Sequence, residues 1–444
     1  MSDPANAFPM ATEVPTAPTS GMEDVDAFRA RSRRWLAENM TPLHQREAQA
    51  APRNDDDDVQ HARDLMARIY EAGFAGICFP KQYGGQGLSV AHMRAWSEEA
   101  QHYEMPSRFN TPTMTIIMPT LLDYGSEAQK MEHIPKTLRG EELWVQFLSE
   151  PTGGSDLAGA ITKATPNGQG FIVNGSKIWS TEAHCSDYCL CLCRTNWDVP
   201  KHQGLSMLLL KIHQPGIHVE QIRQVDGSME FCQEFLDDVA VPLENLVGAE
   251  DDGWAVALRL LHHERAAVGK ASPFGVTMPM GITVQVGARR AVSGAEDPLV
   301  EMTKQLNLGS DPVVRQLVAQ GRILSLIQSA LVERVSTGIE SGVFPSSAGA
   351  LQKLSNATTG IARSELALEI AGTGAAAWLK PGLVSQQAAF FLGRQALGLA
   401  GGSNEIQRNI ISERVLGLPR EWAPDKGVPF KDVRRNTMPT RDSA

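Results

Sequence analysis

The sequence predicts a multidomain α+β protein in which one β domain lies between two helical domains. Segments toward both ends of the chain place apolar residues three and four positions apart, which is the spacing of one helix face. Between them, short β-branched and apolar runs alternate with turn residues, as strands do. The chain of 444 residues also exceeds the length of roughly 250 to 300 residues at which single cores stop growing. We therefore expect several domains in the order α, β, α.

Domain boundaries are placed where the pattern changes. The first helical domain spans 23–143, the β domain 144–250 and the second helical domain 251–420. Residues 1–22 combine Pro with small polar residues, which predicts a disordered arm, and residues 421–444 form a tail of mixed charge, either mobile or clasping a partner. Residues 270–310 have weak periodicity, and we expect a long connection between two helices there.

Two shorter patterns predict local structure. Asn174-Gly175, within GFIVNGSKIWST, is a dipeptide that readily adopts the positive φ angles of a type I′ turn, so a hairpin is expected at this point. The run from Asp55 to Asp58, close to Pro52, lacks the spacing of a metal site and is interpreted as a solvated loop.

Composition argues against several classes of function and location. A formal net charge of −10 provides no global basic field, so nucleic acid is not expected as a partner. No apolar run reaches the roughly 18 residues that a membrane helix needs, so no membrane span is expected. The first residues lack the basic and apolar regions of a secretory signal. Six cysteines without a disulfide framework fit a reducing compartment, and we expect free thiols in a cytoplasmic protein.

No metal site is expected. Cys189, Cys191 and Cys193 alternate with leucines, so they share one face of a predicted strand, where a free Cys acts as a small hydrophobe. His262 and His263 are adjacent on a predicted helix and point in different directions, unlike the i, i+4 spacing that brings two imidazoles to one ion.

Three segments have residues suited to a bound cofactor. SEPTGGSDLAG, Ser149 to Gly159, lets backbone N–H groups and hydroxyls approach a phosphate or a flat ring, although a plain structural loop fits the same composition. Trp179-Ser180-Thr181 places an indole beside two hydroxyls, which suits a flat ring, but a Trp at a strand end is more often part of a core. Gly401-Gly402 precedes a hydroxyl that can cap a helix starting near Asn404, whose N-terminus can hold an anion.

Glu264 is a candidate general base. In the helix that begins near Trp254, an apolar stripe recurs every four positions and includes Glu264, namely Val256, Leu260, Glu264 and Val268. Desolvation on such a stripe raises the pKa of a carboxyl group and prepares it to accept a proton. A salt bridge at the edge of the stripe is an alternative that the pattern alone leaves open.

Taken together and in this order, three segments resemble those of the acyl-CoA dehydrogenase family, and the resemblance extends from about residue 25 to residue 420. They are GEELWVQFLSEPTGGSDLAG, KIWST and LAGGSNEIQRNIISERVLGLP. The resemblance implies an N-terminal α-helical domain, a middle β-barrel-like domain and a C-terminal four-helix bundle. It also implies FAD as the cofactor, an acyl-CoA substrate and an electron-transfer flavoprotein as the acceptor.

By this resemblance, site residues are assigned position by position. FAD contacts are expected at Gln146, Leu148, Ser149, Ser155, Trp179, Ser180, Thr181, Glu369, Gly372, Thr373, Gly402, Ser403 and Glu405. Of these, Trp179 would stack near the flavin ring, Thr181 would reach toward N5, and the stretch from Glu369 to Thr373 would meet the FAD of a neighbouring subunit. Substrate contacts are expected at Ser155, Arg265 and Gly401.

The sequence departs from the family pattern in two places. Many members carry the catalytic glutamate two residues before the hydroxyl of the last motif, where this chain has Gly401. The branch that includes isovaleryl-CoA dehydrogenase carries it instead on a bundle helix as a Glu-Arg pair, which Glu264-Arg265 resembles. The Arg-x-x-Phe-Gly stretch, with which a neighbouring subunit usually holds the FAD pyrophosphate, does not occur between Gly294 and Val318.

The activity implied is α,β-dehydrogenation of an acyl-CoA thioester. Glu264 would take the pro-R Cα proton and flavin N5 the Cβ hydride, while a ribityl hydroxyl and the backbone N–H of Gly401 would stabilise the enolate oxygen. Alternatives are an oxidase, a nitroalkane-oxidising enzyme or a monooxygenase on the same fold, and a non-catalytic support subunit. The nitroalkane branch has an aspartate at the position of Gly401, which counts against it. We expect a homodimer, a homotetramer, or a heterotetramer with a related subunit, and the acyl group stays open.

Overall fold

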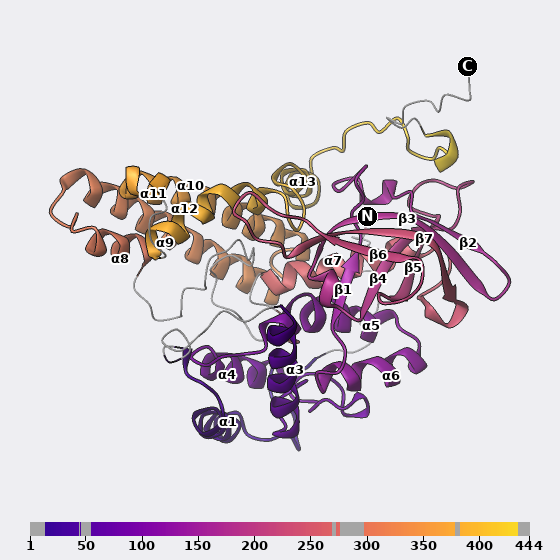
Figure 1. The fold of residues 1–444 in the computed structure, drawn as a ribbon, viewed down its shortest axis with the longest axis horizontal. Coiled ribbons are helices and arrows are strands. Elements are labelled where there is room, and N and C mark those ends of the chain that lie inside the picture. Colours follow the sequence, from indigo (N-terminus) through magenta and orange to yellow (C-terminus); the bar gives the residue numbers. More distant parts are fainter. Residues whose placement is uncertain are drawn as a thin grey trace.

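The chain folds into three parts. The computed structural model describes residues 14–43, 45, 55–268, 272–275, 297–377 and 382–433. In Figure 1 the N-terminal helices form one part, the sheet a second, and the long helices of the C-terminal part a third. Helix α7 (Gly253–Val268) lies where the three parts meet and packs against the π-helical turn Phe109–Ile117, strand β5 and helix α10. The predicted helical, β, helical fold class is confirmed.

Side-chain caps begin helices α1 and α6 of the N-terminal part. Asp24 accepts hydrogen bonds from the backbone N–H groups of Asp26 and Ala27, and Ser126 with Gln129 forms a capping box. Phe74 stacks on Trp96 in the core beneath them, with ring centroids 4.7 Å apart. The helices are α1 (Val25–Asn39), α3 (Asp55–Glu71), α4 (Val90–Ala100), α5 (Met118–Tyr124) and α6 (Glu127–Leu138).

The prediction of a solvated loop at Asp55 to Asp58 is wrong. These residues form the first turn of α3, where negative charge is favoured by the helix dipole. Arg108 pairs with Asp55 at 3.1 Å, with Asp58 at 3.0 Å and with Glu182, just after strand β3, at 2.9 Å. The acidic run therefore anchors the N-terminal part to the sheet through an arginine that lies far from it in the sequence.

Of the predicted disordered arm, only residues 14–22 are described. The carbonyls of Pro15 and Thr16 accept hydrogen bonds from the N–H groups of Val90 and Ala91, at 2.9 and 3.2 Å. Those N–H groups begin α4 and have no partner within the helix. This stretch is therefore attached to α4, which differs from the prediction for these residues.

A single sheet forms the middle part, in the order β6-β7-β3-β2-β4-β5-β8 with β1 parallel to β4. Cys189, Cys191 and Cys193 are fully buried in one core cluster, as their alternation on one strand face predicted. All six cysteines are free thiols. The strands are β1 (Trp144–Phe147), β2 (Lys163–Pro166), β3 (Gly170–Thr181), β4 (Tyr188–Arg194), β5 (Leu205–Lys211), β6 (Ile217–Gln221), β7 (Phe231–Pro242) and β8 (Leu246–Val247).

The predicted hairpin at Asn174-Gly175 is wrong. Both residues lie inside β3, at a register shift in its pairing with β7. Gly175 takes a φ of 153°, and the Asn174 side chain exchanges hydrogen bonds with Asp238 across the strands. A bulge thus replaces the turn, because β7 pairs with β3 on both sides of this dipeptide.

The C-terminal part is a bundle in which α9 and α12 pack against α10. Of the connection predicted over 270–310, residues 270–271 and 276–296 lie outside the described residues. Its last part contains a helix rather than a loop, since Asp297 caps α8 and Pro298 occupies its first turn. The helices are α8 (Pro298–Gln305), α9 (Pro312–Glu340), α10 (Gly349–Ala371), α11 (Thr373–Ala377), α12 (Leu383–Gly393) and α13 (Asn404–Ile410).

After α13 the chain passes over the sheet (Figure 1). Within the described part of the predicted tail, Phe430 is 2% exposed and its N–H donates to the Val199 carbonyl, so this stretch contacts the β domain of its own chain. None of the described helices has the length and apolar character required to cross a membrane.

Candidate active site

Glu264 occupies the position on α7 that the apolar stripe predicted. Leu260 and Val256, one and two helical turns earlier, are fully buried, whereas Glu264 is partly buried. The Val268 side chain lies outside the described residues. Gln146 on β1 donates from Nε2 to Glu264 Oε2 at 3.2 Å. The carboxylate is therefore fixed by one oxygen between the bundle and the sheet.

The surroundings of Glu264 raise the pKa of its carboxyl group. Burial is the largest cause, because it penalises the charged form. The hydrogen bond from Gln146 and the positive charges of Arg265 and Lys353 act in the opposite direction. Such a group binds a proton more tightly than an exposed glutamate, which is the property required of a general base in a dry site.

Gly401 lies beside the same carboxylate. A Cβ atom added at residue 401 would be 3.1 Å from Glu264 Oε1, closer than most real contacts of a Cβ. Gly401 also has a φ of +66°, which glycine adopts without strain. The two positions at which the sequence comparison placed a catalytic glutamate are thus neighbours in space, and only one of them has a side chain.

The turn that carries Gly401 is held by its own downstream helix. Gln407 Nε2 donates to the carbonyls of Gly401 and Gly402, at 3.2 Å each. Ser403 caps α13 by accepting a hydrogen bond from the N–H of Ile406, so the predicted cap is present. Glu405 is in the first turn of this helix.

The loop from Leu148 to Ala160 is anchored from beneath by a buried ion pair. Glu150 accepts hydrogen bonds from the N–H groups of Ile161 and Thr162, and its carboxylate lies 2.9 Å from the ammonium of Lys177, which is fully buried. Lys177 also donates to the Leu148 carbonyl at 3.1 Å. The ammonium lowers the pKa of Glu150 against the opposing effect of burial. Above this anchor, Ser149 is partly buried and Ser155 is exposed.

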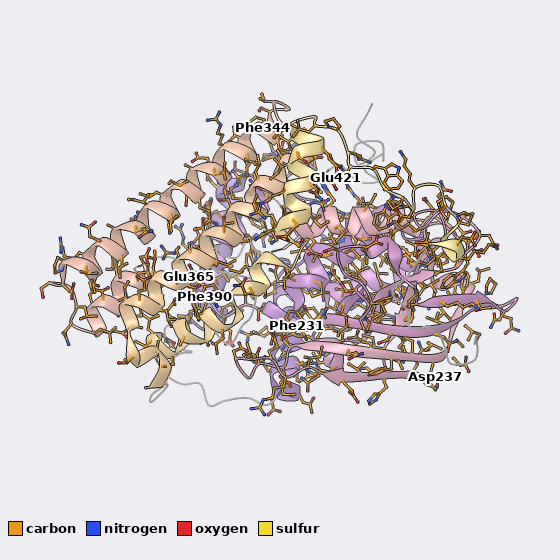
Figure 2. All side chains as sticks on the ribbon, turned by 90° about the horizontal axis from the view of Figure 1, so that it is seen from above. Phe231, Asp237, Phe344, Glu365, Phe390 and Glu421 are labelled. Atoms are coloured by element: carbon orange, nitrogen blue, oxygen red, sulfur yellow. The ribbon has the colours of Figure 1, made fainter. Side chains whose placement is uncertain are left out.

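Near the end of β3, the indole of Trp179 is exposed. Trp179 has a φ of 68° at a register shift in the strand and is 55% exposed, so it is not a core residue. Ser180 points inward and donates from Oγ to Glu234 Oε2 at 3.0 Å. Thr181 pairs with Phe231, and Figure 2 shows Phe231 at the end of the sheet nearer the bundle and Asp237 toward the opposite end.

The described residues bring several predicted site residues together and separate others. Gln146, Glu264 and Gly401 meet, and the N–H of Ile178 donates to the Ser149 carbonyl, which places that loop next to the end of β3. Glu369 lies near the far end of α10, about 24 Å along the helix from residue 353 at 1.5 Å per residue, and Gly372 and Thr373 follow the end of that helix. They do not reach Glu264 within this chain.

Two contributors escaped the sequence analysis. Gln146 was predicted only as a contact of FAD, and its side chain contacts Glu264. Lys353 on α10 lies beside Gly401, with its Cε 3.4 Å from the Cβ position there. Buried Ala350 and Ala357, three residues before and four after it, mark the inward face of the helix, and this spacing was the available signal. Among the described residues, no group of three or more His, Cys, Asp or Glu side chains is arranged to hold a metal ion.

Comparison with known proteins covers nearly the whole chain. Models of the acyl-CoA dehydrogenase N-terminal, middle and C-terminal domains match residues 22–141, 146–239 and 251–416. Acyl-CoA dehydrogenase IpdE1 of Mycobacterium tuberculosis is 34% identical over 409 residues, 90% of this chain and 99% of that protein. The steroid ACAD Tcur3481-Tcur3483 has a TM-score of 0.70 at 25% identity and covers 90% of this chain and 99% of its own. The ChsE4-ChsE5 complex of Mycobacterium tuberculosis has a TM-score of 0.67 at 25% identity and covers 91% and 100%. The chain therefore belongs to the acyl-CoA dehydrogenase family.

Proposed function

We propose that this protein dehydrogenates an acyl-CoA thioester between Cα and Cβ, with Glu264 as the base that takes the Cα proton. Members of the family are FAD-dependent oxidoreductases, and this chain is one of them. The observation that supports the role of Glu264 is its position: a partly buried carboxylate with a raised pKa lies against Gly401, which has no acidic side chain of its own.

The residues at the end of β3 and in the neighbouring loop fit FAD. Trp179 offers an exposed aromatic face, and Thr181 provides a hydroxyl beside it. Gly153 and Gly154 have no atom closer than 3.7 Å to the place of a Cβ, so a flat group can approach their backbone. Ser149, Trp179 and Thr181 would hold the cofactor, which when bound supplies the acceptor for the hydride that leaves Cβ.

The carboxylate oxygens of Glu264 have different tasks in this proposal. Oε2 accepts the hydrogen bond from Gln146, which orients the group. Oε1 is directed toward Gly401 and takes the proton from Cα. The backbone N–H of Gly401 donates to the thioester oxygen, where negative charge grows as the proton leaves, and a donor already in place stabilises that charge. Glycine keeps this N–H while leaving room for the carboxylate.

Electron acceptor and assembly are further parts of the proposal. We propose that an electron-transfer flavoprotein receives the electrons. If turnover consumed oxygen stoichiometrically instead, the protein would be an oxidase. The ChsE4-ChsE5 structure is a complex of two named chains, which supports assembly with a related subunit as well as with a second copy. Because Glu369, Gly372 and Thr373 lie far from Glu264, we propose that they contact the FAD of a neighbouring subunit.

The test is anaerobic reduction of the bound flavin by a panel of straight, branched, aromatic and steroid-linked acyl-CoA thioesters. Glu264→Gln keeps the size of the side chain and removes its basicity. We expect reduction by the best substrate to slow by at least about 10²-fold, the lower range for general-base catalysis. FAD content and melting temperature should match those of the parent. Glu132→Gln, at an exposed pair on α6, is the control and should react at the parent rate. Parent-rate reduction in Glu264→Gln would remove this residue from the reaction.

A further inference from the structure

We infer that Lys353 is a positioning residue for the proposed reaction, because it holds the turn that leads to Gly401 and places a positive charge beside Glu264. This inference rests on the proposed function. Lys353 is on α10, in the C-terminal bundle, whereas Glu264 is on α7 and Gly401 follows the short 3-10 turn Arg394–Gly398. Three segments of the chain thus converge at this residue.

The first observation is a hydrogen bond between α10 and the turn that leads to Gly401. Lys353 Nζ donates to the carbonyl of Leu397 at 2.6 Å. Leu397 is 7% exposed and comes four residues before Gly401. A short, charge-assisted hydrogen bond to a buried carbonyl is among the stronger ones in proteins. It fixes the segment whose Gly401 N–H is proposed to receive the thioester oxygen.

The second observation is that the side chains of Lys353 and Glu264 both lie next to Gly401. Lys353 Cε and Glu264 Oε1 both lie within 3.4 Å of the point that a Cβ on residue 401 would occupy. The two side chains therefore flank the space that a side chain on residue 401 would fill.

The third observation is that each of the two groups favours the charged form of the other. Burial lowers the pKa of Lys353, and the charge of Glu264 opposes this. Burial raises the pKa of Glu264, and Lys353 opposes that, together with Arg265 on the same helix and the hydrogen bond from Gln146 on β1. A lysine on a buried helix face without a compensating charge is costly. Lys353 thereby keeps Glu264 ionised, and able to accept a proton, at lower pH.

Three substitutions of Lys353 test the charge and the hydrogen bond separately. Lys353→Met keeps most of the apolar stem but removes both, whereas Lys353→Gln removes the charge and retains an N–H donor. Lys353→Arg keeps the charge. The measurement is the rate of anaerobic flavin reduction by the best acyl-CoA substrate against pH, in FAD-loaded protein. Lys211→Met, at an exposed position of β5, is the control.

Removal of the charge should move the acidic limb of the pH profile. Without Lys353 the pKa of Glu264 rises, so the rate begins to fall at a higher pH as the solution is acidified. We expect Lys353→Met and Lys353→Gln to shift this limb upward by about one pH unit, at the lower end of the effect of a nearby opposite charge on a carboxyl group. Lys353→Arg and the control should retain the parent limb.

A purely structural role predicts a different result. In that case Lys353→Met lowers the melting temperature while the limb stays where it is in the parent, and the inference is overturned. If the Lys353→Met variant fails to fold, the position of the acidic limb in Lys353→Gln tests the inference in its place. Glu264→Gln distinguishes this failure from that of the proposed function. If Glu264→Gln is slow but the limb does not move in the Lys353 variants, only the role of Lys353 is lost. If Glu264→Gln reacts at the parent rate, both the proposed role of Glu264 and that of Lys353 are overturned.

Discussion

Glu264 and Glu234 are two of the described glutamates whose pKa values are raised chiefly by burial, and their surroundings differ. Glu234 is fully buried on β7 and accepts a hydrogen bond from Ser180, so no substrate reaches it. Glu264 is partly buried and lies at the junction of α7, β1 and the turn at Gly401. A raised pKa alone therefore does not identify a base, and accessibility separates the two carboxyl groups.

Glu234 should make the stability of the fold depend on pH. Burial raises its pKa to about 8, so the folded state keeps the proton after the unfolded state, with a value near 4.5, has released it. The unfolded state thus binds fewer protons between these two values, and stability falls as pH rises through that window. Glu234→Gln has no proton to retain. We expect its melting temperature to fall less than that of the parent between about pH 5 and 8.

The measurement is thermal unfolding of both proteins at a series of pH values. Well below a pH of 4.5 the two should respond to pH alike, because the parent carboxyl is then protonated in both the folded and the unfolded state. Parallel melting curves across the whole window would show that Glu234 does not bind its proton in the folded protein.

At the scale of elements, the segment after α13 is attached to the sheet by one aromatic anchor. The guanidinium carbon of Arg194 lies 3.8 Å from the centre of the Phe430 ring, and Trp197 contacts the same ring with centroids 5.4 Å apart. Lys201 pairs with Asp425 of this segment at 2.7 Å. It also pairs with Asp156, in the loop of small residues, at 3.0 Å. The segment and that loop therefore share one lysine.

Phe430→Ala should detach the segment locally while the rest of the fold stays intact. The ring contacts are its main apolar attachment, whereas an exposed or half-exposed ion pair contributes little, about 0 to 1 kcal/mol. We expect trypsin to cleave at Lys426 or Lys431 at least about tenfold faster, since cleavage follows the population of the open form. The melting temperature should change little.

Trp422→Ala is the matched control, because that aromatic side chain is 85% exposed. Its cleavage rate should equal that of the parent. Equal rates in Phe430→Ala as well would mean that Phe430 does not hold the segment.

At the scale of the whole molecule, α9 has a stripe of apolar side chains that the described residues leave exposed. Ile323, Leu326 and Ile327 are 56%, 52% and 61% exposed, at the i, i+3, i+4 spacing of one helix face. Contiguous exposed apolar side chains on one face mark an interaction surface more often than scattered ones do. We predict that a second copy or a related subunit packs against the bundle at this stripe.

We predict that the protein is larger than a monomer in solution and that Ile327→Glu shifts its mass downward. A charge placed in an apolar interface is desolvated without a partner, which disfavours association. Sedimentation or native mass measurement tests this, with Met131→Glu, at a 55% exposed position on α6, as the control that should keep the parent mass. A parent that is monomeric and retains stoichiometric FAD would contradict the prediction.

The sequence by itself determined the features that depend on neighbours along the chain. Apolar spacing placed the helices and strands in the order α, β, α, and the stripe through Val256 and Leu260 put Glu264 on a buried helix face. The alternation of Cys189, Cys191 and Cys193 placed three thiols in one core. These periodicities are set by the geometry of a single helix or strand, so no distant contact is needed to recognise them.

Only the tertiary structure decided the features that depend on distant segments. Asn174-Gly175 favours a turn locally, but pairing of β3 with β7 on both sides of it outweighs that preference. The acidic run that begins at Asp55 forms the start of a helix, and Arg108, which is distant in the sequence, pairs with Asp55. Lys353 and Glu264 both lie next to Gly401 because α10, α7 and the turn before Gly401 pack together. Such contacts join residues far apart in the chain, and local periodicity contains no information about which segments will meet.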